Sequence, residues 1–308
     1  MEISLHLPIC TACGVQYESS TAPETCLICD DPRQYVPATG QAWTTLGAMQ
    51  VSTAGYRNEI KLVDPEEELE LYSVCTVPKF GMDQRALLMV RDGGKRNVLW
   101  DCVSFLDAET VERITRLGGI SMIVLSHPHF YATHVDWART FKCEVYLSSM
   151  DTDFLMRPNA NDVQRFINED IFTVEGDDEL SVVRVDGHFP GSMVCGWKGR
   201  HLLVSDSISV ALSGVGRRPR RAGTTSFNFM WSHCNMIPLD ASAIYYIWVA
   251  IRDMKFDAVH GHRDGLTVKP NAKERVLESM KIVLEKMGCC DELVFDFEAE
   301  EEYLYFEV

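Results

Sequence analysis

The sequence lacks any apolar run long enough to cross a membrane, and it is poor in basic residues. A membrane-spanning helix needs roughly 20 apolar residues, and the N-terminus has neither the basic nor the apolar region of an export signal. The 29 Lys and Arg residues are outnumbered by 45 Asp and Glu residues, which gives a formal net charge of −16. We therefore expect a cytoplasmic protein with no nucleic-acid and no membrane partner, because an acidic surface is repelled by both.

One short basic run interrupts this acidic composition. Residues 217–221 read Arg-Arg-Pro-Arg-Arg, which is typical either of a solvated loop or of a segment that steers an anion toward a pocket. The chain has 308 residues, of which 46% are hydrophobic. That is enough for one large domain or two ordinary ones with a sizeable core.

Four of the eleven cysteines form two Cys-x-x-Cys pairs near the N-terminus. Twelve residues separate Cys10 and Cys13 from Cys26 and Cys29. Four thiolates in two such pairs can enclose a tetrahedral metal ion, and without an export signal reduced thiols are favoured over disulfides. We predict a small metal-dependent unit over residues 1–40, followed by a larger domain over residues 41–308.

The spacing of these cysteines, together with Gly14, Tyr17 and Pro23, resembles the rubredoxin-like module at the end of rubrerythrins. This resemblance covers only residues 1–40. It implies iron held by four thiolates, with electron transfer as one function. Zinc at the same ligands would make the unit a structural zinc ribbon, and we favour zinc because the rest of the sequence shows no flavin, haem or diiron partner for electrons.

Short apolar runs alternate with helical patterns along the rest of the chain, which predicts an α/β domain. The expected strands lie at 69–77, 86–91, 98–101, 120–125, 143–147, 180–185, 202–204, 256–259 and 301–308. The expected helices lie at 108–117, 135–141, 239–254 and 271–287. We expect residues 148–178 to form a long loop, either a lid or a dimer contact.

Three histidines follow the strand that ends at Leu125: His127, His129 and His134. Two histidines at positions i and i+2 of an extended chain project to the same side and can hold one metal ion. Hydrogen bonding at the surface is the alternative for an isolated pair of this kind.

The same pattern recurs where three other strands end. The strands at 180–185, 202–204 and 256–259 lead into His188, Asp206 and His262. Each of these residues alone could be an ordinary turn, cap or surface residue. Neighbouring strands lie about 5 Å apart, so polar side chains at their ends can converge. Together they predict one shared metal site.

The order of these motifs resembles the metallo-β-lactamase fold superfamily over about residues 50 to 270. The resemblance rests on Ser126-His127-Pro128-His129, Gly187-His188-Phe189-Pro190-Gly191-Ser192, Leu203-Val204-Ser205-Asp206-Ser207 and His260-Gly261-His262. It implies a four-layer αβ/βα sandwich with a metal site at one edge between two sheets. It also implies His127, His129 and His188 as ligands of a first metal, Asp206 as a bridging ligand, and His262 as the last ligand of a second metal.

The sequence departs from the family at one position. The usual motif continues with Asp-His one residue after its second histidine, whereas Tyr131 and Ala132 stand here. A rebuilt loop could bring in His134 and Asp136; otherwise these two form a capping or surface pair. The loss favours a single metal ion, with Asp206 completing the site or holding a water. Zinc suits these ligands, and iron or manganese stays open.

These features favour a metal-dependent hydrolase that acts on a small ester, thioester, lactone or phosphoester. From position, Asp206, His134 and Asp136 are base candidates, and Tyr131 is a candidate acid or oxyanion donor. A redox protein with an iron-loaded four-cysteine unit and a non-catalytic metal-binding scaffold are the alternatives. We expect a small-molecule substrate, and a homodimer stays open.

A further aromatic and histidine pair lies before the long apolar helix. Trp231 and His233 are candidates for the wall of the substrate pocket, or else for core packing.

Overall fold

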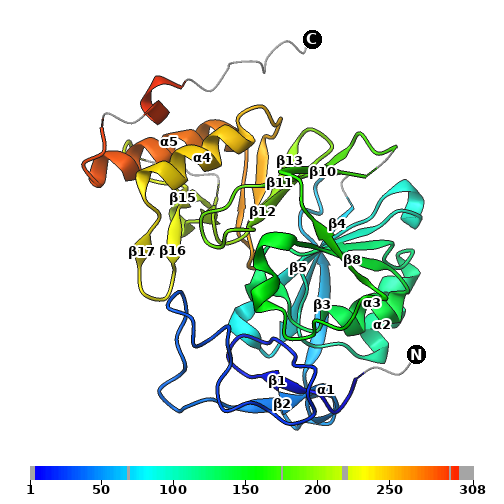
Figure 1. The fold of residues 1–308 in the computed structure, drawn as a ribbon. Coiled ribbons are helices and arrows are strands. Elements are labelled where there is room, and N and C mark those ends of the chain that lie inside the picture. The colour runs from blue at the N-terminus through cyan, green and yellow to red at the C-terminus, as the bar shows by residue number, and fades with distance from the viewer. Residues whose placement is uncertain (1–3, 68–69, 175, 217–220, 291–292, 298–308) are drawn as a thin grey trace.

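The computed structural model describes residues 4–67, 70–174, 176–216, 221–290 and 293–297. Most of the basic run and the expected strand at 301–308 lie outside the described residues. Two large β-sheets form the body of the molecule (Figure 1). The first contains, in spatial order, β3 (Arg57–Leu62), β4 (Leu71–Val77), β5 (Arg85–Met89), β6 (Val98–Trp100), β7 (Met122–Val124), β8 (Glu144–Ser148) and β9 (Gln164–Ile167). The second contains β10 (Ile171–Thr173), β11 (Leu180–Arg184), β12 (Met193–Trp197), β13 (His201–Leu203), β18 (Ala258–His260) and β19 (Thr267–Val268).

Helices cover the outer faces of both sheets. They are α2 (Ala108–Arg116) and α3 (His134–Phe141) on the first sheet, and α4 (Ala241–Ile251) and α5 (Ala272–Lys286) on the second. The Asp107 carboxylate accepts a hydrogen bond from Thr110 N at 2.8 Å and caps α2; Asp240 caps α4 in the same way through Ala243 N. Such caps satisfy amide groups that have no partner within the helix.

Three buried clusters define the layers. Trp100 and Val124 of the first sheet pack with Trp197 and Leu203 of the second, so one apolar cluster lies between the sheets. A second cluster joins the first sheet to α2 and α3, and a third joins the second sheet to α4 and α5. The order is therefore helices, sheet, sheet, helices, and the predicted four-layer sandwich is confirmed.

The directions of the strands place several strand ends at one edge. β13 pairs with β18 in parallel, and β11 runs parallel to both because it is antiparallel to β12, which is antiparallel to β13. The carboxyl ends of β11, β13 and β18 thus meet at the same edge of the second sheet. The chain that leaves β7 in the first sheet comes to this edge as well.

The prediction of a long loop over residues 148–178 is wrong. This segment contains a short 3-10 helix (Ser149–Phe154) and the edge strands β9 and β10. β9 adds to β8 in parallel, and β10 adds to β11 in antiparallel fashion. The Gln-Arg-Phe-Ile sequence of β9 has only its two end residues buried, so its apolar pattern is too short to indicate a strand.

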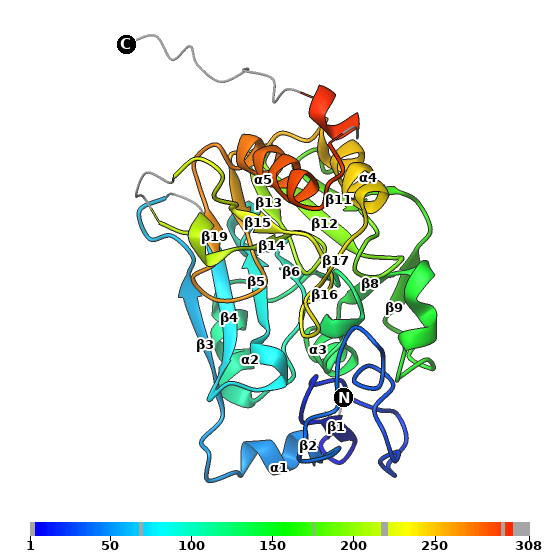
Figure 2. The same ribbon diagram turned by 90° about the vertical axis from the view of Figure 1, so that its left-hand side faces the viewer.

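The four-cysteine unit, which we call the cysteine module, lies at one end of the molecule, beside α3 (Figures 1 and 2). Its strand β1 (Pro8–Cys10) pairs with β2 (Trp43–Thr45), and α1 (Leu46–Gln50) follows directly. Because β2 lies beyond residue 40, the cysteine module extends past that residue. Ile9, Val15 and Ile28 belong to the same buried cluster as Trp137 of α3. The module and the first sheet therefore share one continuous core.

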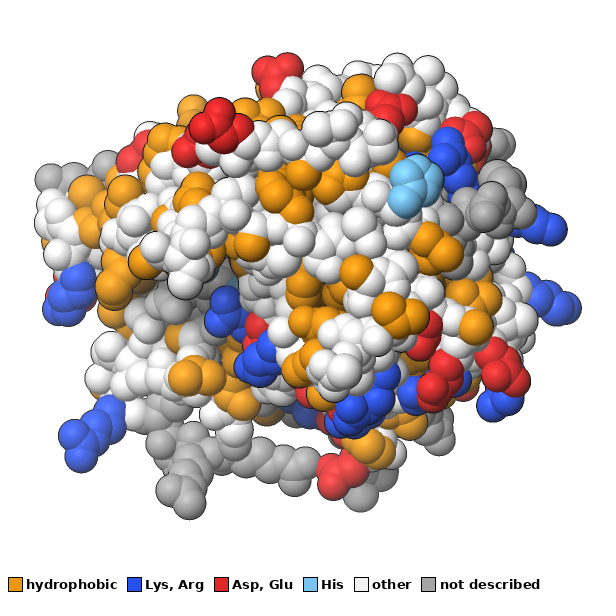
Figure 3. All heavy atoms as spheres, turned by 90° about the horizontal axis from the view of Figure 1, so that it is seen from below, with side chains coloured by type: hydrophobic (Ala, Val, Ile, Leu, Met, Phe, Trp, Pro, Cys, Tyr) orange, Lys and Arg blue, Asp and Glu red, His pale blue; other side chains and the backbone are white. Residues whose placement is uncertain are grey.

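Two small two-stranded sheets complete the described part. They pair β14 (Ser209–Val210) with β15 (Phe227–Asn228), and β16 (Met230–Ser232) with β17 (Ile237–Pro238). Within the described ranges, no helix has the length and apolar character required to cross a membrane. On the face seen from below in Figure 3, Lys and Arg side chains lie among Asp and Glu side chains, with apolar side chains between them.

Candidate metal centre

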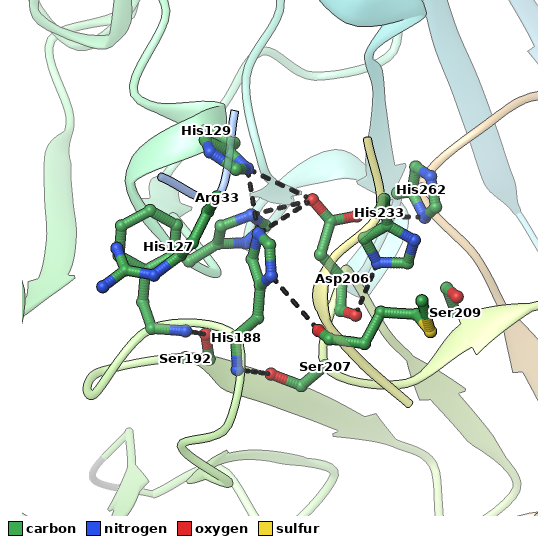
Figure 4. Close-up of polar contacts among 12 residues, drawn as sticks. Arg33, His127, His129, His188, Ser192, Asp206, Ser207, Ser209, His233 and His262 are labelled. Atoms are coloured by element: carbon green, nitrogen blue, oxygen red, sulfur yellow. Dashed lines mark hydrogen bonds and ion pairs between the residues drawn. The ribbon is translucent and has the colours of Figure 1, made fainter. Parts of the chain in front are cut away.

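Three imidazoles and one carboxylate converge at the edge between the sheets (Figure 4). Their ligand atoms, contributed by His127, His129, His188 and Asp206, all lie within 4.8 Å of one another. Asp206 Oδ2 lies 3.1 Å from His127 Nε2, 3.3 Å from His129 Nδ1 and 3.6 Å from His188 Nε2. The structure thus brings together four residues from three segments that are widely separated in the sequence, as the ends of β7, β11 and β13 led us to predict.

The loop that carries His127 and His129 is tied to both sheets. After β7 the chain enters a 3-10 helix (Pro128–Phe130) that begins directly after His127 and contains His129, so this pair is not in extended chain as the sequence predicted. Ser126 N donates to Asp101 Oδ1 at 2.7 Å, and Met193 N donates to Ser126 O at 2.9 Å. Because Asp101 follows β6 and Met193 begins β12, the imidazole pair is fixed relative to both sheets.

The loop that carries His188 is held against the Asp206 turn. His188 N donates to Ser207 Oγ at 3.1 Å, and Ser207 Oγ donates to Asp186 O at 2.6 Å. Gly191 comes so close to the first sheet that an added Cβ would lie 2.3 Å from Ser148 Oγ. Only glycine fits there without movement, which explains its place three residues after the histidine.

The donor set fits a metal ion. His188 Nδ1 faces the Met230 carbonyl at 3.3 Å and so carries the proton, which leaves the Nε2 lone pair pointing into the cluster. His188 Nε2 and His129 Nδ1 are 3.1 Å apart, a close approach for two basic nitrogens. A cation between them and Asp206 Oδ2 would satisfy all three atoms.

Electrostatics favour the states that bind a metal. Burial lowers the pKa of His127 to about 4 and holds the pKa of His188 well below its ordinary value, so both rings are neutral at neutral pH. Burial opposes ionisation of Asp206, but the surrounding imidazoles, His262 first, lower its pKa well below the ordinary range. The cluster therefore presents neutral nitrogens and an ionised carboxylate.

His262 and His233 lie on the other side of Asp206 (Figure 4). His262 Nδ1 is 3.5 Å from Asp206 Oδ1, the carboxylate oxygen that the three other histidines do not share. Burial lowers the pKa of His262 to about 4. His233 Nε2 donates to the Asp206 carbonyl at 3.0 Å. His262 thus faces the cluster without belonging to its group of four ligand atoms.

The structure does not bring His134 and Asp136 into the cluster. His134 Nδ1 donates to Tyr131 O at 2.7 Å, and its Nε2 accepts from Gln164 Nε2 at 2.9 Å. Asp136 pairs with Arg157 at 3.3 Å and accepts from Ser4 N. Both side chains are buried at the start of α3, which packs against the first sheet. The predicted base roles of these two residues have no geometric basis.

Tyr131 also lies away from the cluster. Its side chain is fully buried in the core shared by the first sheet and the cysteine module, and its ring packs edge-on against His134. Burial raises the pKa of its hydroxyl well above the ordinary value. The predicted acid or oxyanion role of Tyr131 therefore has no structural support, because the 3-10 helix that contains His129 ends at Tyr131 and directs this residue into the core.

A pocket of about 990 Å³ opens onto the cluster. His129, Asp206, His262 and His233 line it, so His233 belongs to the pocket wall as predicted. Trp231 instead packs against the cluster of the second sheet and lies 5.5 Å from the Arg33 guanidinium. The cysteine module contributes Ala12, Cys29, Gln34, Tyr35 and Pro37 to the wall.

The four cysteines of the module form a second group of metal ligands. Cys10, Cys13, Cys26 and Cys29 are all buried, with their ligand atoms within 4.8 Å of one another. Cys10 Sγ and Cys29 Sγ lie 3.6 Å apart, as do Cys13 Sγ and Cys26 Sγ. These separations exceed a disulfide bond and suit thiolates around one tetrahedral ion. The metal-binding arrangement that the spacing predicted is present, whereas the identity of the ion stays a prediction.

Two supporting residues were missed in the sequence. Asp101, which anchors the histidine loop, follows β6 with a φ of 64°; the strand-end rule that indicated His188 and Asp206 would have indicated it too. Burial raises the pKa of Asp101 to about 8. Gln84 donates to Cys13 O at 3.0 Å and also to His129 O. No signal in the sequence pointed to Gln84.

Solved metallo-beta-lactamases share this architecture. The DIM-1 metallo-beta-lactamase aligns with 75% of this chain and 98% of its own, at a TM-score of 0.50 and 12% sequence identity. TMB-1 aligns over the same shares, also at a TM-score of 0.50, with 13% identity. At such identities the likeness concerns the fold alone. Together with the His and Asp cluster, it gives the protein the metallo-β-lactamase fold.

The sequence itself is similar to one curated protein. It is 38% identical over 277 residues to the uncharacterized protein YmaE of Bacillus subtilis (strain 168), covering 88% of this chain and 93% of YmaE. The chain belongs to the same family as YmaE. No protein-family model matches it.

Proposed function

We propose that the protein is a metal-dependent hydrolase with one metal ion, preferably zinc, held by His127, His129, His188 and Asp206. The observation that carries the proposal is the convergence of three imidazole nitrogens and one carboxylate oxygen at the bottom of a pocket. The substrates are small esters, thioesters, lactones or phosphoesters. Zinc in this site would supply Lewis acidity, which polarises a carbonyl or phosphoryl group and lowers the pKa of water.

The residues around the cluster have different roles in the proposed reaction. Asp206 Oδ2 faces the three histidines, while its Oδ1 faces His262 Nδ1. We assign Asp206 Oδ1 and His262 as the groups that accept a proton during hydrolysis, because Asp206 and His262 both line the pocket. Asp101 holds the histidine loop through Ser126 N. Asp206 is thus the one predicted catalytic residue that keeps its assignment.

The residues at the positions that would have to supply ligands to a second metal support a single-metal site. Tyr131 and Ala132 replace the usual Asp-His, and both are buried in the core. Among the described residues, His262 is the histidine that faces the outer oxygen of Asp206. With the cysteine module filled, we expect two metal ions per chain.

The test combines metal analysis with an activity panel. The purified protein should contain two ions per chain, and three would contradict the single-metal site. His188→Ala should remove one ion and abolish hydrolysis of p-nitrophenyl esters, thioesters, lactones and phosphodiesters. His134→Gln, which changes a buried histidine outside the cluster, is the matched control and should keep both. Retention of the ion and of activity in His188→Ala would disprove the site assignment.

A redox function is the second candidate, and one observation favours it. Cys29 of the module and His129 of the cluster line the same pocket, a proximity that would suit electron transfer if the module held iron. Visible absorption of an iron–thiolate centre in the purified protein would support this function. A colourless protein with zinc at the cysteines would exclude it.

A further inference from the structure

The cysteine module supplies one wall of the pocket above the metal centre. Gln34, Tyr35 and Pro37 line the same pocket as His129 and Asp206. These module residues follow directly on the second cysteine pair, so the metal ligands Cys26 and Cys29 fix the start of the segment. We call residues 30–37 the module loop.

Hydrogen bonds connect the module loop to the segment that carries His233. Ser232 Oγ donates to Arg33 O at 2.9 Å, and Asn235 Nδ2 donates to Pro32 O at 3.0 Å. Cys234 Sγ donates to Gln34 Oε1 at 3.0 Å. Asn235 Nδ2 also donates to Gln34 O at 3.4 Å. Hydrogen bonds to three backbone carbonyls and one side chain therefore hold the loop at the pocket.

A largely buried cation connects the same loop to the segment that carries His188. The Arg33 guanidinium lies 4.1 Å from the centre of the Phe189 ring and 5.7 Å from that of Phe154. Its side chain is only 15% exposed and forms an ion pair with Asp31 at 3.3 Å. A desolvated guanidinium over an aromatic face is a strong contact. The loop is thus attached to both sides of the metal centre (Figure 4).

Tyr35 contrasts with its neighbours in the module loop. It lines the pocket and yet is 59% exposed. Across the part of the chain that the structure describes, its hydroxyl has no hydrogen-bond partner, and its ring stacks on no other ring. An aromatic side chain with no internal partner, held at the rim of a pocket by a fastened loop, is placed to contact a ligand.

We propose that the cysteine module selects the substrate: Tyr35 packs against an apolar or aromatic group of the substrate whose hydrolysed bond lies at the metal centre. This proposal rests on the hydrolase function proposed above. Part of the remaining pocket wall offers such a group further contacts, because Leu212, Val210 and Leu266 also line it, beside polar and charged residues such as Ser213, Asn228 and Arg263. Leu212 is 83% exposed, so the apolar lining continues to the pocket mouth. Substrates that lack an apolar arm would leave this surface unused.

Turnover of a graded series tests the proposal. The series consists of p-nitrophenyl acetate, benzoate and biphenylcarboxylate, with the matching thioesters. Wild-type kcat/KM should rise with the size of the apolar arm. In Tyr35→Ala, kcat/KM should fall about tenfold for the substrate with the largest apolar arm, the effect expected from removing one aromatic contact face. It should change little for acetate. Tyr35→Phe should behave as wild type.

Two control variants separate this effect from general damage. Leu27→Ala changes an exposed side chain of the same module that does not line the pocket, and Tyr246→Ala changes a tyrosine of similar exposure on α4. Both should keep the wild-type preference. An equal loss for every substrate in Tyr35→Ala, or an unchanged preference, would overturn the proposal.

Ligand binding provides a readout that needs no turnover. Isothermal titration of the metal-loaded protein with acetate, benzoate and biphenylcarboxylate should give tighter binding as the apolar group grows. The increase in affinity from acetate to biphenylcarboxylate should be about tenfold smaller in Tyr35→Ala than in wild type. If no substrate is hydrolysed but Tyr35→Ala still removes the gain, the hydrolase function fails while the binding role of the module stands. If wild type and Tyr35→Ala bind the series alike, the binding role fails.

Discussion

The carbonyl oxygens of Cys13 and His129 accept hydrogen bonds from one and the same nitrogen, Nε2 of Gln84. One carbonyl belongs to the first cysteine pair and the other to a ligand of the metal centre. Gln84 is 5% exposed, so the bridge is shielded from water. The two metal-binding groups are therefore parts of one packed structure, although Cys13 and His129 lie more than one hundred residues apart in the chain.

Replacing Gln84 by Met should show how much this bridge contributes. The side chain keeps its shape, but two buried carbonyls lose their donor, which costs about 2 kcal/mol of unfolding free energy. Gln50→Met is the matched control, because Gln50 donates once, to Leu106 O, from an exposed position. Its cost should stay below about 1 kcal/mol. Urea denaturation measures both, and equal costs would mean that the bridge adds nothing.

Removing one cysteine ligand should separate the two metal groups. Cys26→Ser is expected to lose the module ion and to lower stability, since the ion supplies much of the folding free energy of so small a unit. The His and Asp cluster should keep its own ion. Elemental analysis would then give one ion in place of two. Cys289→Ser, outside both groups, should keep two, and a Cys26→Ser protein with both ions would refute the four-thiolate site.

The stability of the protein should fall on mild acidification, partly through His134. Burial lowers the pKa of His134 from 6.5 to about 4, so the unfolded chain takes up this proton first as the pH falls. The contribution of His134 to the free energy of unfolding is therefore fully present above about pH 6.5. It is lost between pH 6.5 and 4, at up to about 1.4 kcal/mol per pH unit. His134→Gln should flatten the pH dependence in this window.

Urea midpoints measured from pH 7 to pH 4 test this expectation. The variant must be compared with wild type rather than judged alone, because other buried histidines act in the same direction. His6→Gln changes an exposed histidine and should reproduce the wild-type slope. A His134→Gln slope equal to that of wild type would show that His134 is not held neutral by the fold.

Adding a methyl group at Gly191 should weaken metal binding without touching a ligand. The new Cβ would lie 2.3 Å from Ser148 Oγ and 2.6 Å from Asp151 Oδ2, so the His188 loop must move. We expect at least a tenfold loss of affinity at the His and Asp cluster and a stability cost of about 1–3 kcal/mol. Metal competition with a chelator measures the affinity.

The double variant Gly191→Ala with Ser148→Ala provides the rescue. Removing the Ser148 hydroxyl takes away the closest clash and should restore part of the affinity. Ser148→Ala alone loses one hydrogen bond to Met150 N and should leave the affinity close to wild type. Full affinity in the single Gly191→Ala variant would mean that the loop adapts freely.

The sequence was sufficient to locate the metal centre because its ligands follow apolar strands directly. β7, β13 and β18 are short runs of buried residues, and β11 is buried at three of its five residues. Each is followed within a few residues by a histidine or aspartate. The helix α2 was equally clear, with Asp107 as its cap and two glycines at its end. Strong local patterns of this kind survive without knowledge of the tertiary structure.

The roles of Tyr131, His134 and Tyr35 could not be derived in this way. Whether a residue after His129 turns into the pocket or into the core depends on the 3-10 turn and on the cysteine module that packs there. Tyr35 lies more than 90 residues before His127, and only the folded loop brings it to the pocket. Contacts between distant segments leave no periodic signal in the sequence.

The shared core of the module and the first sheet has a consequence for the order of events during synthesis. All four cysteines precede the histidine loop in the chain, so they are able to bind their ion before that loop is made. Their packing partners Gln84 and Trp137 are made much later. The ion-bound module would then be a preformed surface on which the histidine loop closes.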